Sequence, residues 1–326
     1  MGGGDPNSER LLEVRGLSIV HAGAAAPAVD GVDLTLDPGE VVGIVGESGS
    51  GKTTLALSLL GLLPAAARVT AGSIRLRGRE LLGLSEAELE GVRGAQLSLV
   101  PQEPGVALNP VLRAGVQLEE VLRAHGRQDP AARRDEVLRL LAEVGLRDEA
   151  RVAASYPHEL SGGERQRVAV AQAIACRPAV VVADEPTSAL DASTQAALLS
   201  LFAELRRRLG LAFVLVTHDL GALAALADRV LVMYAGRIVE AGPLSRVLAE
   251  PWHPYTRALL AAVPGPRGPG GERRLPVVAG SPPAAGVRAP GCAFEPRCAE
   301  RLERCASSAP SLDERRDRSV RCFLYG

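Results

Sequence analysis

This 326-residue sequence contains few lysines, few aromatic residues and no long hydrophobic run. Lys52 is the only lysine among 37 lysines and arginines, and aromatic residues make up 3% of the chain. A core with so few rings must consist mostly of leucine, valine and alanine. No apolar run reaches the roughly 18 residues of a membrane span, and the polar start MGGGDPNSER lacks the apolar centre of a signal peptide. Any role at a membrane is therefore expected to depend on a partner.

The sequence also lacks an excess of charge of either sign. Its 37 basic and 38 acidic residues give a formal net charge of −1. Nucleic-acid-binding domains are usually strongly basic, so no nucleic-acid partner is predicted. With 47% hydrophobic and 23% charged residues, the composition is that of an ordinary globular protein with one large domain or two.

Two kinds of hydrophobic pattern indicate the fold class. Continuous apolar runs at 41–46, 180–184 and 212–216 are typical of strands covered on both faces of a sheet. Helical spacing appears between them, with apolar residues on one face at Val137, Leu140, Leu141 and Val144, and again at Leu198, Leu201, Leu205 and Leu209. Alternation at Val32, Leu34 and Leu36, and at Ile74 and Leu76, predicts further strands. The predicted class is α/β with a largely parallel core.

Composition also divides the chain. Residues 264–291 are about half glycine and proline, which is typical of a linker. The prediction is a main domain at 1–260, a linker at 261–291 and a short cysteine-rich extension at 292–326.

The stretch GESGSGKT at 46–53 follows an apolar run and precedes a helical pattern, the context that a phosphate-binding loop requires. Its glycines let backbone N–H groups turn toward a polyphosphate, and the following helix directs its positive end at the same anion. A compact ammonium fits such a ring of backbone better than a wide guanidinium, which explains a lone lysine here. The candidate nucleotide-binding residues are Gly46, Ser48, Gly49, Ser50, Gly51, Lys52, Thr53 and Thr54.

Two carboxylates end the apolar run at 180–184. Asp184 is a candidate to hold Mg²⁺, together with the Thr53 hydroxyl, and Glu185 is a candidate to orient or deprotonate an attacking water. Adjacent acids at a strand end are otherwise ordinary surface charge. The phosphate loop in the same chain favours the functional interpretation.

A second anion site is indicated by LSGGERQR at 160–167, where Ser161, Gly162 and Gly163 precede a helical pattern. Alone, such a stretch would be a common helix start. Two phosphate-recognition segments more than 100 residues apart are most simply explained if they meet across a dimer of chains.

These motifs together resemble those of the ATP-binding subunits of ABC transporters, over most of the first 250 residues. GESGSGKT is similar to the Walker A loop, LSGGE to the signature motif, VVVADE to the Walker B strand, and SALD, which ends at Asp191, to the D-loop. Gln102 in LVPQEP matches the Q-loop, and His218 in LVTHDL matches the switch histidine. A phosphate-loop kinase would have no need of LSGGE.

The resemblance implies a RecA-like core, an antiparallel β subdomain and a helical subdomain near 103–160. It also implies ATP and Mg²⁺ as cofactors, with Gln102 sensing Mg²⁺ and the γ-phosphate and His218 hydrogen-bonding that phosphate. Family members place an aromatic ring on adenine near the N-terminus. The aligned residue here is His21, whose smaller ring implies weaker stacking.

Further stretches resemble the peptide and nickel importer branch of the family: ALNPV at 107–111, HPYTRALL at 253–260 and GCAFEPRC at 291–298. This branch implies an ATPase that powers import of peptides, or of a solute such as nickel, from the cytoplasmic face of the cell membrane. The implied partners are two permease subunits, a second ABC ATPase, identical or paralogous, and an extracytoplasmic solute-binding protein. The alternative is a soluble ABC ATPase acting on nucleic acid or ribosomes, which typically has tandem cassettes or coiled-coil insertions.

Four of the five cysteines lie in the last 35 residues. All-thiolate ligation suits either Zn²⁺ or an iron–sulfur cluster, and the spacing lacks the CxxC element usual for zinc. Free thiols are a third alternative, and the resemblance implies a [4Fe–4S] cluster. The remaining cysteine, Cys176, is predicted to be a small buried hydrophobic residue. The candidate ligands are Cys292, Cys298, Cys305 and Cys322.

Overall fold

A computed structural model describes residues 10–126, 129–188, 190–262, 278, 280–283, 286–287 and 289–325. The chain divides into two compact units, which are described separately. Unit 1 comprises Met1–Leu11, Leu36–Glu40 and Leu76–Val216, and unit 2 comprises Leu12–Thr35, Val41–Arg75 and Thr217–Gly326. Most of the predicted linker at 261–291 lies outside the described residues.

Unit 1 contains a parallel set of three strands, β6 (Leu97–Val100), β7 (Val180–Asp184) and β8 (Ala212–Thr217). Every residue of β7 and β8 is buried, as their continuous apolar sequence predicts. Val100 is in register with Ala183, and Asp184 with Val216. The segments that follow β6 and β7 therefore leave the sheet at the same edge.

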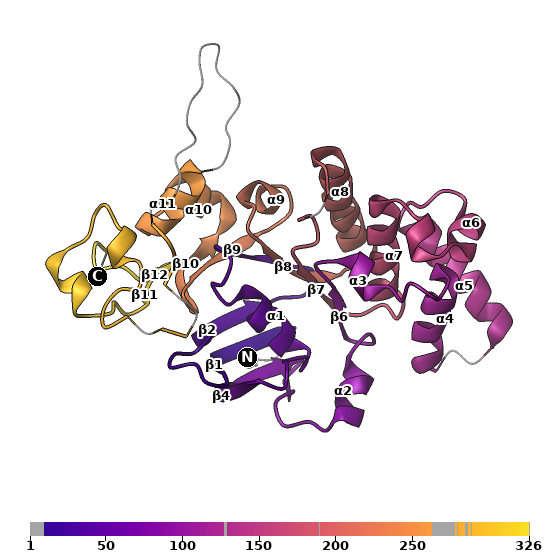
Figure 1. Cartoon of the computed structure of the whole chain (residues 1–326), viewed down its shortest axis with the longest axis horizontal. Helices are drawn as coiled ribbons and strands as arrows, with labels where there is room; N and C mark the ends of the chain where they lie inside the picture. Colours follow the sequence, from indigo (N-terminus) through magenta and orange to yellow (C-terminus); the bar gives the residue numbers. More distant parts are fainter. Residues whose placement is uncertain are drawn as a thin grey trace, which may run out of the picture. The chain divides into compact units, whose positions relative to one another are not determined.

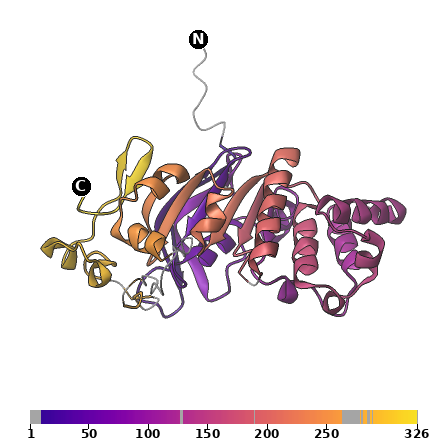
Figure 2. The same ribbon diagram turned by 90° about the horizontal axis from the view of Figure 1, so that it is seen from above.

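The two apolar faces predicted for helices of unit 1 are buried, except that Leu209 at the end of the second helix is half-buried. Val137, Leu140 and Leu141 are at most 3% exposed. Figures 1 and 2 show α4 (Ala114–Ala124), α5 (Pro130–Glu143) and α6 (Glu149–Ala154) clustered together, with α7 (Gly162–Ile174) between this cluster and strands β6 and β7. The elements of unit 1 besides its three parallel strands are β5 (Arg79–Glu80), α2 (Glu86–Val92), α3 (Pro104–Ala107), α4 (Ala114–Ala124), α5 (Pro130–Glu143), α6 (Glu149–Ala154), the 3-10 helix η1 (Pro157–Glu159), α7 (Gly162–Ile174) and α8 (Ala192–Leu209).

Unit 2 begins with β1 (Leu12–His21) and β2 (Val29–Leu36), which neighbour each other in one sheet, with β4 (Ala67–Leu76) on the other side of β1. The predicted alternation is present in β2, where Val32, Leu34 and Leu36 are buried, and at the end of β4, where Ile74 and Leu76 are buried. A second sheet contains β3 (Val41–Val45), which is fully buried and pairs in parallel with β9 (Arg229–Tyr234). The helix α1 (Lys52–Leu59) follows β3 and the phosphate-loop sequence.

The C-terminal part of unit 2 extends the second sheet. Strand β9 pairs antiparallel with β10 (Arg237–Pro243), β10 pairs with β12 (Arg318–Val320), and β12 pairs with β11 (Asp313–Arg315). The cysteine-rich segment thus contributes strands to the same sheet as the phosphate loop, next to β10 and coloured yellow in Figure 1. The remaining elements are α9 (Leu220–Ala224), α10 (Leu244–Ala249), α11 (Pro254–Ala261) and the 3-10 helices η2 (Glu295–Arg297) and η3 (Glu303–Ala306).

The parallel pairs and the interleaved helices confirm the predicted α/β class with a largely parallel core. In the described part of the chain, no helix combines the length and the apolar character needed to cross a bilayer. The prediction that Cys176 is buried is wrong. It lies in the turn after α7 and is half-buried, because α7 ends at Ile174 before the chain returns to the sheet.

Candidate functional site

The phosphate-loop sequence lies between β3 and α1 of unit 2, as predicted. Gly49 and Gly51 have φ angles of +79° and +102°, which favour glycine. A Cβ at Gly51 would overlap the Ala28 carbonyl oxygen, and a Cβ at Gly46 would overlap the Met233 carbonyl oxygen. The loop therefore depends on glycine for conformation at one position, for space at another, and for both at Gly51.

Lys52 is the first residue of α1, and its side chain contacts the backbone of this loop. It is 4% exposed, and its Nζ donates to the carbonyl oxygens of Gly46 at 2.8 Å and Glu47 at 3.0 Å. Thr53 at the start of α1 is exposed, as is Ser48. Within the described ranges, the buried Ser50 Oγ has no hydrogen-bond partner.

Other elements of unit 2 hold the loop in place. The Gly236 N–H donates to the Ser50 carbonyl oxygen at 3.0 Å, and the Glu47 N–H donates to the Tyr255 hydroxyl at 2.8 Å. Tyr255 lies in α11, within the HPYTRALL stretch, and is fully buried. Sequence reasoning treated that stretch as a marker of the family branch and missed its contact with the loop.

The two histidines predicted for nucleotide contact also lie in unit 2. His21 is the last residue of β1 and is half-buried, and its carbonyl oxygen accepts from the Ala24 N–H at 3.0 Å. His218 follows β8 and is exposed. Next to it, Thr217 Oγ1 accepts from the Asp219 N–H at 2.9 Å, and Asp219 caps α9 by accepting from the Gly221 N–H at 2.7 Å.

The carboxylate pair lies at the end of β7 in unit 1. Asp184 is 4% exposed, whereas Glu185 is half-buried. Glu185 has a φ of +44°, an unfavourable conformation for a residue with a side chain, and its N–H is fixed by the Val216 carbonyl oxygen at 2.9 Å. Gln102 is exposed just beyond β6, the parallel neighbour of β7. The structure thus places Gln102 and the two acids at one edge of the strands.

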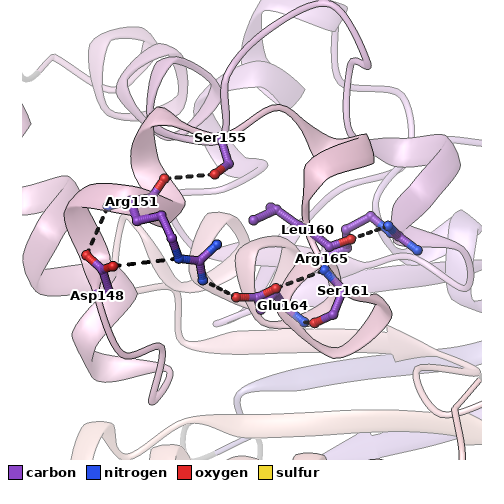
Figure 3. A network of polar contacts seen from close by, with 7 residues as sticks. All are labelled: Asp148, Arg151, Ser155, Leu160, Ser161, Glu164 and Arg165. Atoms are coloured by element: carbon purple, nitrogen blue, oxygen red, sulfur yellow. Dashed lines mark hydrogen bonds and ion pairs between the residues drawn. The ribbon is translucent and has the colours of Figure 1, made fainter.

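The LSGGE sequence forms the start of α7, where Ser161 is the N-cap. Its Oγ accepts from the Glu164 N–H at 3.2 Å, and the Glu164 carboxylate accepts from the Ser161 N–H at 2.8 Å. Arg151 of α6 donates to Glu164 and lies 3.7 Å from Asp148 (Figure 3). Burial alone would raise the pKa of Glu164, but its hydrogen bonds with Ser161 and Arg151 outweigh that effect and lower it. The charged carboxylate therefore stabilises the cap.

This network leaves the first residues of the helix accessible. Ser161 and Gly162 are exposed, and Arg165 holds the preceding turn by donating to the Leu160 carbonyl oxygen at 2.5 Å. Figure 3 shows the side chains of Arg151 and Glu164 directed toward each other beside the N-cap. The predicted D-loop residue, Asp191, is likewise an N-cap and accepts from Thr194 Oγ1 at 2.8 Å and from two backbone N–H groups. Hydrogen bonds, chiefly from Thr194, lower its pKa.

Four cysteines of the C-terminal segment line one cavity of unit 2, together with His253 and Phe294. The cavity has a volume of about 20 Å³, room for about one water molecule, so a four-iron cluster would require the thiols to move apart. Burial raises the pKa of three of these thiols and keeps them protonated near neutral pH. Among the residues that the structure describes, no group of three or more His, Cys, Asp or Glu side chains is arranged to hold a metal ion. The predicted cluster ligands Cys292, Cys298, Cys305 and Cys322 are thus gathered but not in metal-binding geometry.

His253 shows how firmly this part of unit 2 is packed. It is 2% exposed, and its Nδ1 accepts from the Tyr255 N–H at 3.0 Å as the N-cap of α11. Burial lowers its pKa to about 3, so the imidazole is neutral. The role of His253 is therefore structural, as a buried cap of α11.

Comparison with known proteins places these features in a family. Residues 29–188 match the family described as ABC transporter, and residues 239–305 match the oligopeptide/dipeptide transporter C-terminal region. The chain is 43% identical over 320 residues to the dipeptide transport ATP-binding protein DppD of Bacillus subtilis (strain 168), covering 97% of this chain and 95% of that protein. It is 44% identical over 306 residues to the oligopeptide transport ATP-binding protein OppD of Salmonella typhimurium (strain LT2), covering 93% and 90%.

Solved structures agree with this assignment. One is the dimeric post-hydrolysis state of the ATP-binding cassette MJ0796 bound to ADP and Pi, with a TM-score of 0.64 and 30% identity. The match covers 72% of this chain and 98% of that one. The predicted ABC ATPase cassette is thereby confirmed, and the chain belongs to the ATPase subunits of the ABC transporter family, in the branch that carries the oligopeptide/dipeptide transporter C-terminal region.

Proposed function

We propose that this protein hydrolyses ATP to power the import of peptides, or of a related small solute such as nickel, through a membrane permease. The observation that carries the proposal is similarity over nearly the whole chain to dipeptide and oligopeptide transport ATP-binding proteins. The match to the transporter C-terminal region at 239–305 separates this function from that of a soluble ABC ATPase on nucleic acid or ribosomes.

In the proposed site, the triphosphate is bound by the backbone of 46–51 and by Lys52. The lysine would exchange its bonds to the Gly46 and Glu47 carbonyl oxygens for phosphate oxygens, which a flexible stem allows. Thr53, Gln102 and Asp184 would hold Mg²⁺, which supplies charge neutralisation on the phosphates. Glu185 orients the attacking water and accepts its proton, and His218 donates a hydrogen bond to the γ-phosphate. His21 would contact the adenine.

A second ABC ATPase subunit, identical or paralogous, completes each nucleotide site in this proposal. Support comes from the start of α7, where Ser161 and Gly162 are exposed, Gly163 is half-buried, and the capping box between Ser161 and Glu164 fixes the helix end. Exposed N–H groups at a helix start attract a phosphate. Asp191 would lie beside the same interface. ATP then joins the two ATPases, and loss of the γ-phosphate separates them.

The proposed assembly contains two transmembrane permease subunits and an extracytoplasmic solute-binding protein, and the ATPase binds peripherally at the cytoplasmic face of the cell membrane. No nucleic acid is involved. The proposed domains remain the ATPase domain at 1–260, with a helical subdomain near 103–160, the linker at 261–291 and the C-terminal extension at 292–326.

The transport proposal is tested with the chain purified together with its two permease subunits and placed in proteoliposomes with the solute-binding protein. We expect uptake of a radiolabelled dipeptide, tripeptide or Ni²⁺. This uptake should require ATP on the side of the membrane that carries the ATPase subunits, and it should be lost in Lys52→Met. Failure of the permease subunits to co-purify, or uptake that persists in Lys52→Met, would contradict the proposal.

We further propose that Cys292, Cys298, Cys305 and Cys322 bind a [4Fe–4S] cluster, with zinc as the alternative. Support comes from four thiols around one cavity, a donor set that suits either group once the thiols lose their protons and, for the cluster, move apart. When bound, the cluster would cross-link the C-terminal segment. Anaerobically purified protein is expected to contain about four irons per chain, with broad visible absorbance that falls in Cys298→Ser. Colourless protein with stoichiometric zinc would identify the alternative, and metal-free protein would refute both.

A further inference from the structure

The C-terminal segment reaches the phosphate loop directly, through an ion pair within unit 2. Arg297 Nη1 donates to Glu47 Oε2 at 2.6 Å, and Nη2 donates to Glu47 Oε1 at 2.9 Å. The Arg297 side chain is 4% exposed and that of Glu47 is 24% exposed. Such a bidentate, largely buried ion pair is strong, and it fixes the relative orientation of the two side chains as well as their separation.

The Arg297 guanidinium has further partners besides Glu47, and these fix its position. Its guanidinium donates to the Tyr234 hydroxyl at 3.2 Å and to the Val278 carbonyl oxygen at 3.3 Å. It also lies 5.8 Å from the ring centre of Tyr234 and 5.9 Å from that of Phe294. The hydrogen bonds with Glu47 raise the pKa of Arg297, which is permanently charged in any case. A fixed positive charge is therefore placed against the loop.

Glu47 connects this charge to the lysine of the loop. Its carboxylate accepts hydrogen bonds from Arg297, and its N–H donates to the Tyr255 hydroxyl at 2.8 Å. Its carbonyl oxygen accepts from Lys52 Nζ at 3.0 Å. Both side-chain contacts come from residues more than 200 positions away in the sequence. The backbone next to the phosphate site is thus positioned from the C-terminal part of the chain.

The turn that carries Arg297 is framed by cysteines. The Glu295 N–H donates to the Cys292 carbonyl oxygen at 3.0 Å, and the Cys298 N–H donates to the Glu295 carbonyl oxygen at 3.1 Å. The Cys292 N–H in turn donates to the Cys305 carbonyl oxygen at 2.8 Å. These backbone hydrogen bonds therefore fix the position of Arg297 relative to Glu47.

We infer that Arg297 is a positioning residue for ATP binding: it neutralises Glu47 and holds the phosphate loop in the shape that accepts a triphosphate. The inference rests on the proposed role of this loop. Glu47 carries a negative charge one residue from Gly46, beside the place proposed for an anion of several charges. Without Arg297 the carboxylate would repel the phosphates and would be free to swing toward Lys52.

The test is a double-mutant cycle between Arg297 and Glu47 in the full chain. For each variant, the dissociation constant for MgATP and the thermal unfolding are measured. Arg297→Met is expected to weaken MgATP binding about tenfold or more, because it leaves Glu47 unpaired. Glu47→Gln combined with Arg297→Met should recover most of that loss. Arg297→Lys keeps the charge but not the bidentate contact, so an intermediate loss of MgATP affinity is expected. In the assembled transporter, the KM for ATP should rise in Arg297→Met while kcat changes by less than about twofold.

Arg304→Met is the matched control, because Arg304 lies in the same segment and donates instead to the Phe323 carbonyl oxygen. It is expected to bind MgATP like the parent chain. Normal binding in Arg297→Met, or a double variant as weak as the single one, would overturn the inference. If Arg297→Met fails to fold, an unchanged dissociation constant in Arg297→Lys would do the same. Normal MgATP binding by Lys52→Met would instead refute the proposed role of the loop.

Discussion

Replacing Glu185 by glutamine is expected to lower ATP hydrolysis by a factor of about 100 or more, while MgATP binding is retained. Glutamine has nearly the shape of glutamate, so the backbone at φ +44° and its bond to Val216 should persist. An amide, however, does not accept the proton that the attacking water releases. Phosphate release measures the rate, and equilibrium titration with MgATP measures binding. We expect the ATP-bound variant to accumulate as a pair of ATPase subunits.

Glu204→Gln is the matched control for this change. Glu204 is an exposed carboxylate on α8 of unit 1, paired with Arg208 at 3.1 Å and not one of the proposed site residues. It should hydrolyse ATP at the parental rate. Parental turnover in Glu185→Gln would show that another group accepts the proton. Loss of binding together with turnover would show that the substitution disturbs the site rather than the chemistry.

Sequence patterns predicted the parts of the fold that local chemistry determines. Buried apolar runs became β3, β7 and β8, and the glycine-rich stretch between β3 and α1 became the phosphate loop. In each case the residues that reveal the element are adjacent or lie on one helical face, so a short window contains the whole pattern. The LSGGE helix start was predictable for the same reason, because its capping box needs only Ser161 and Glu164.

Contacts between distant residues were not predictable in this way. The pairing of Arg297 with Glu47 joins positions 250 residues apart, and no local pattern distinguishes this arginine from the many others. Strand β12 has only three residues, too few for alternation to appear, yet it pairs with β10. Glycine and proline between 264 and 291 indicated a separate tail, whereas the residues after them complete the sheet of unit 2.

Burial of a second ion pair leads to the largest stability effect that we expect. Arg318 on β12 donates to Glu240 Oε1 on β10 at 2.7 Å, and the two side chains are 3% and 0% exposed. The Trp252 and His253 N–H groups donate to the same carboxylate at 2.9 and 2.8 Å. The Arg318 guanidinium also lies 3.8 Å from the centre of the Trp252 ring. Of these partners, Arg318 is the one that β12 supplies, and it carries the positive charge.

Arg318→Met should therefore lower the free energy of unfolding by about 3–5 kcal/mol, because it leaves the Glu240 carboxylate buried without a counter-charge. Glu240→Gln combined with Arg318→Met should lose less, since no buried charge then remains. Trp252 is the only tryptophan of the chain, so its fluorescence during urea unfolding reports on this cluster directly. Arg315→Met, on the adjacent strand with a side chain that is 51% exposed, should unfold like the parent. If Arg318→Met also unfolds like the parent, the Arg318–Glu240 pair does not stabilise the packing of β12 on β10.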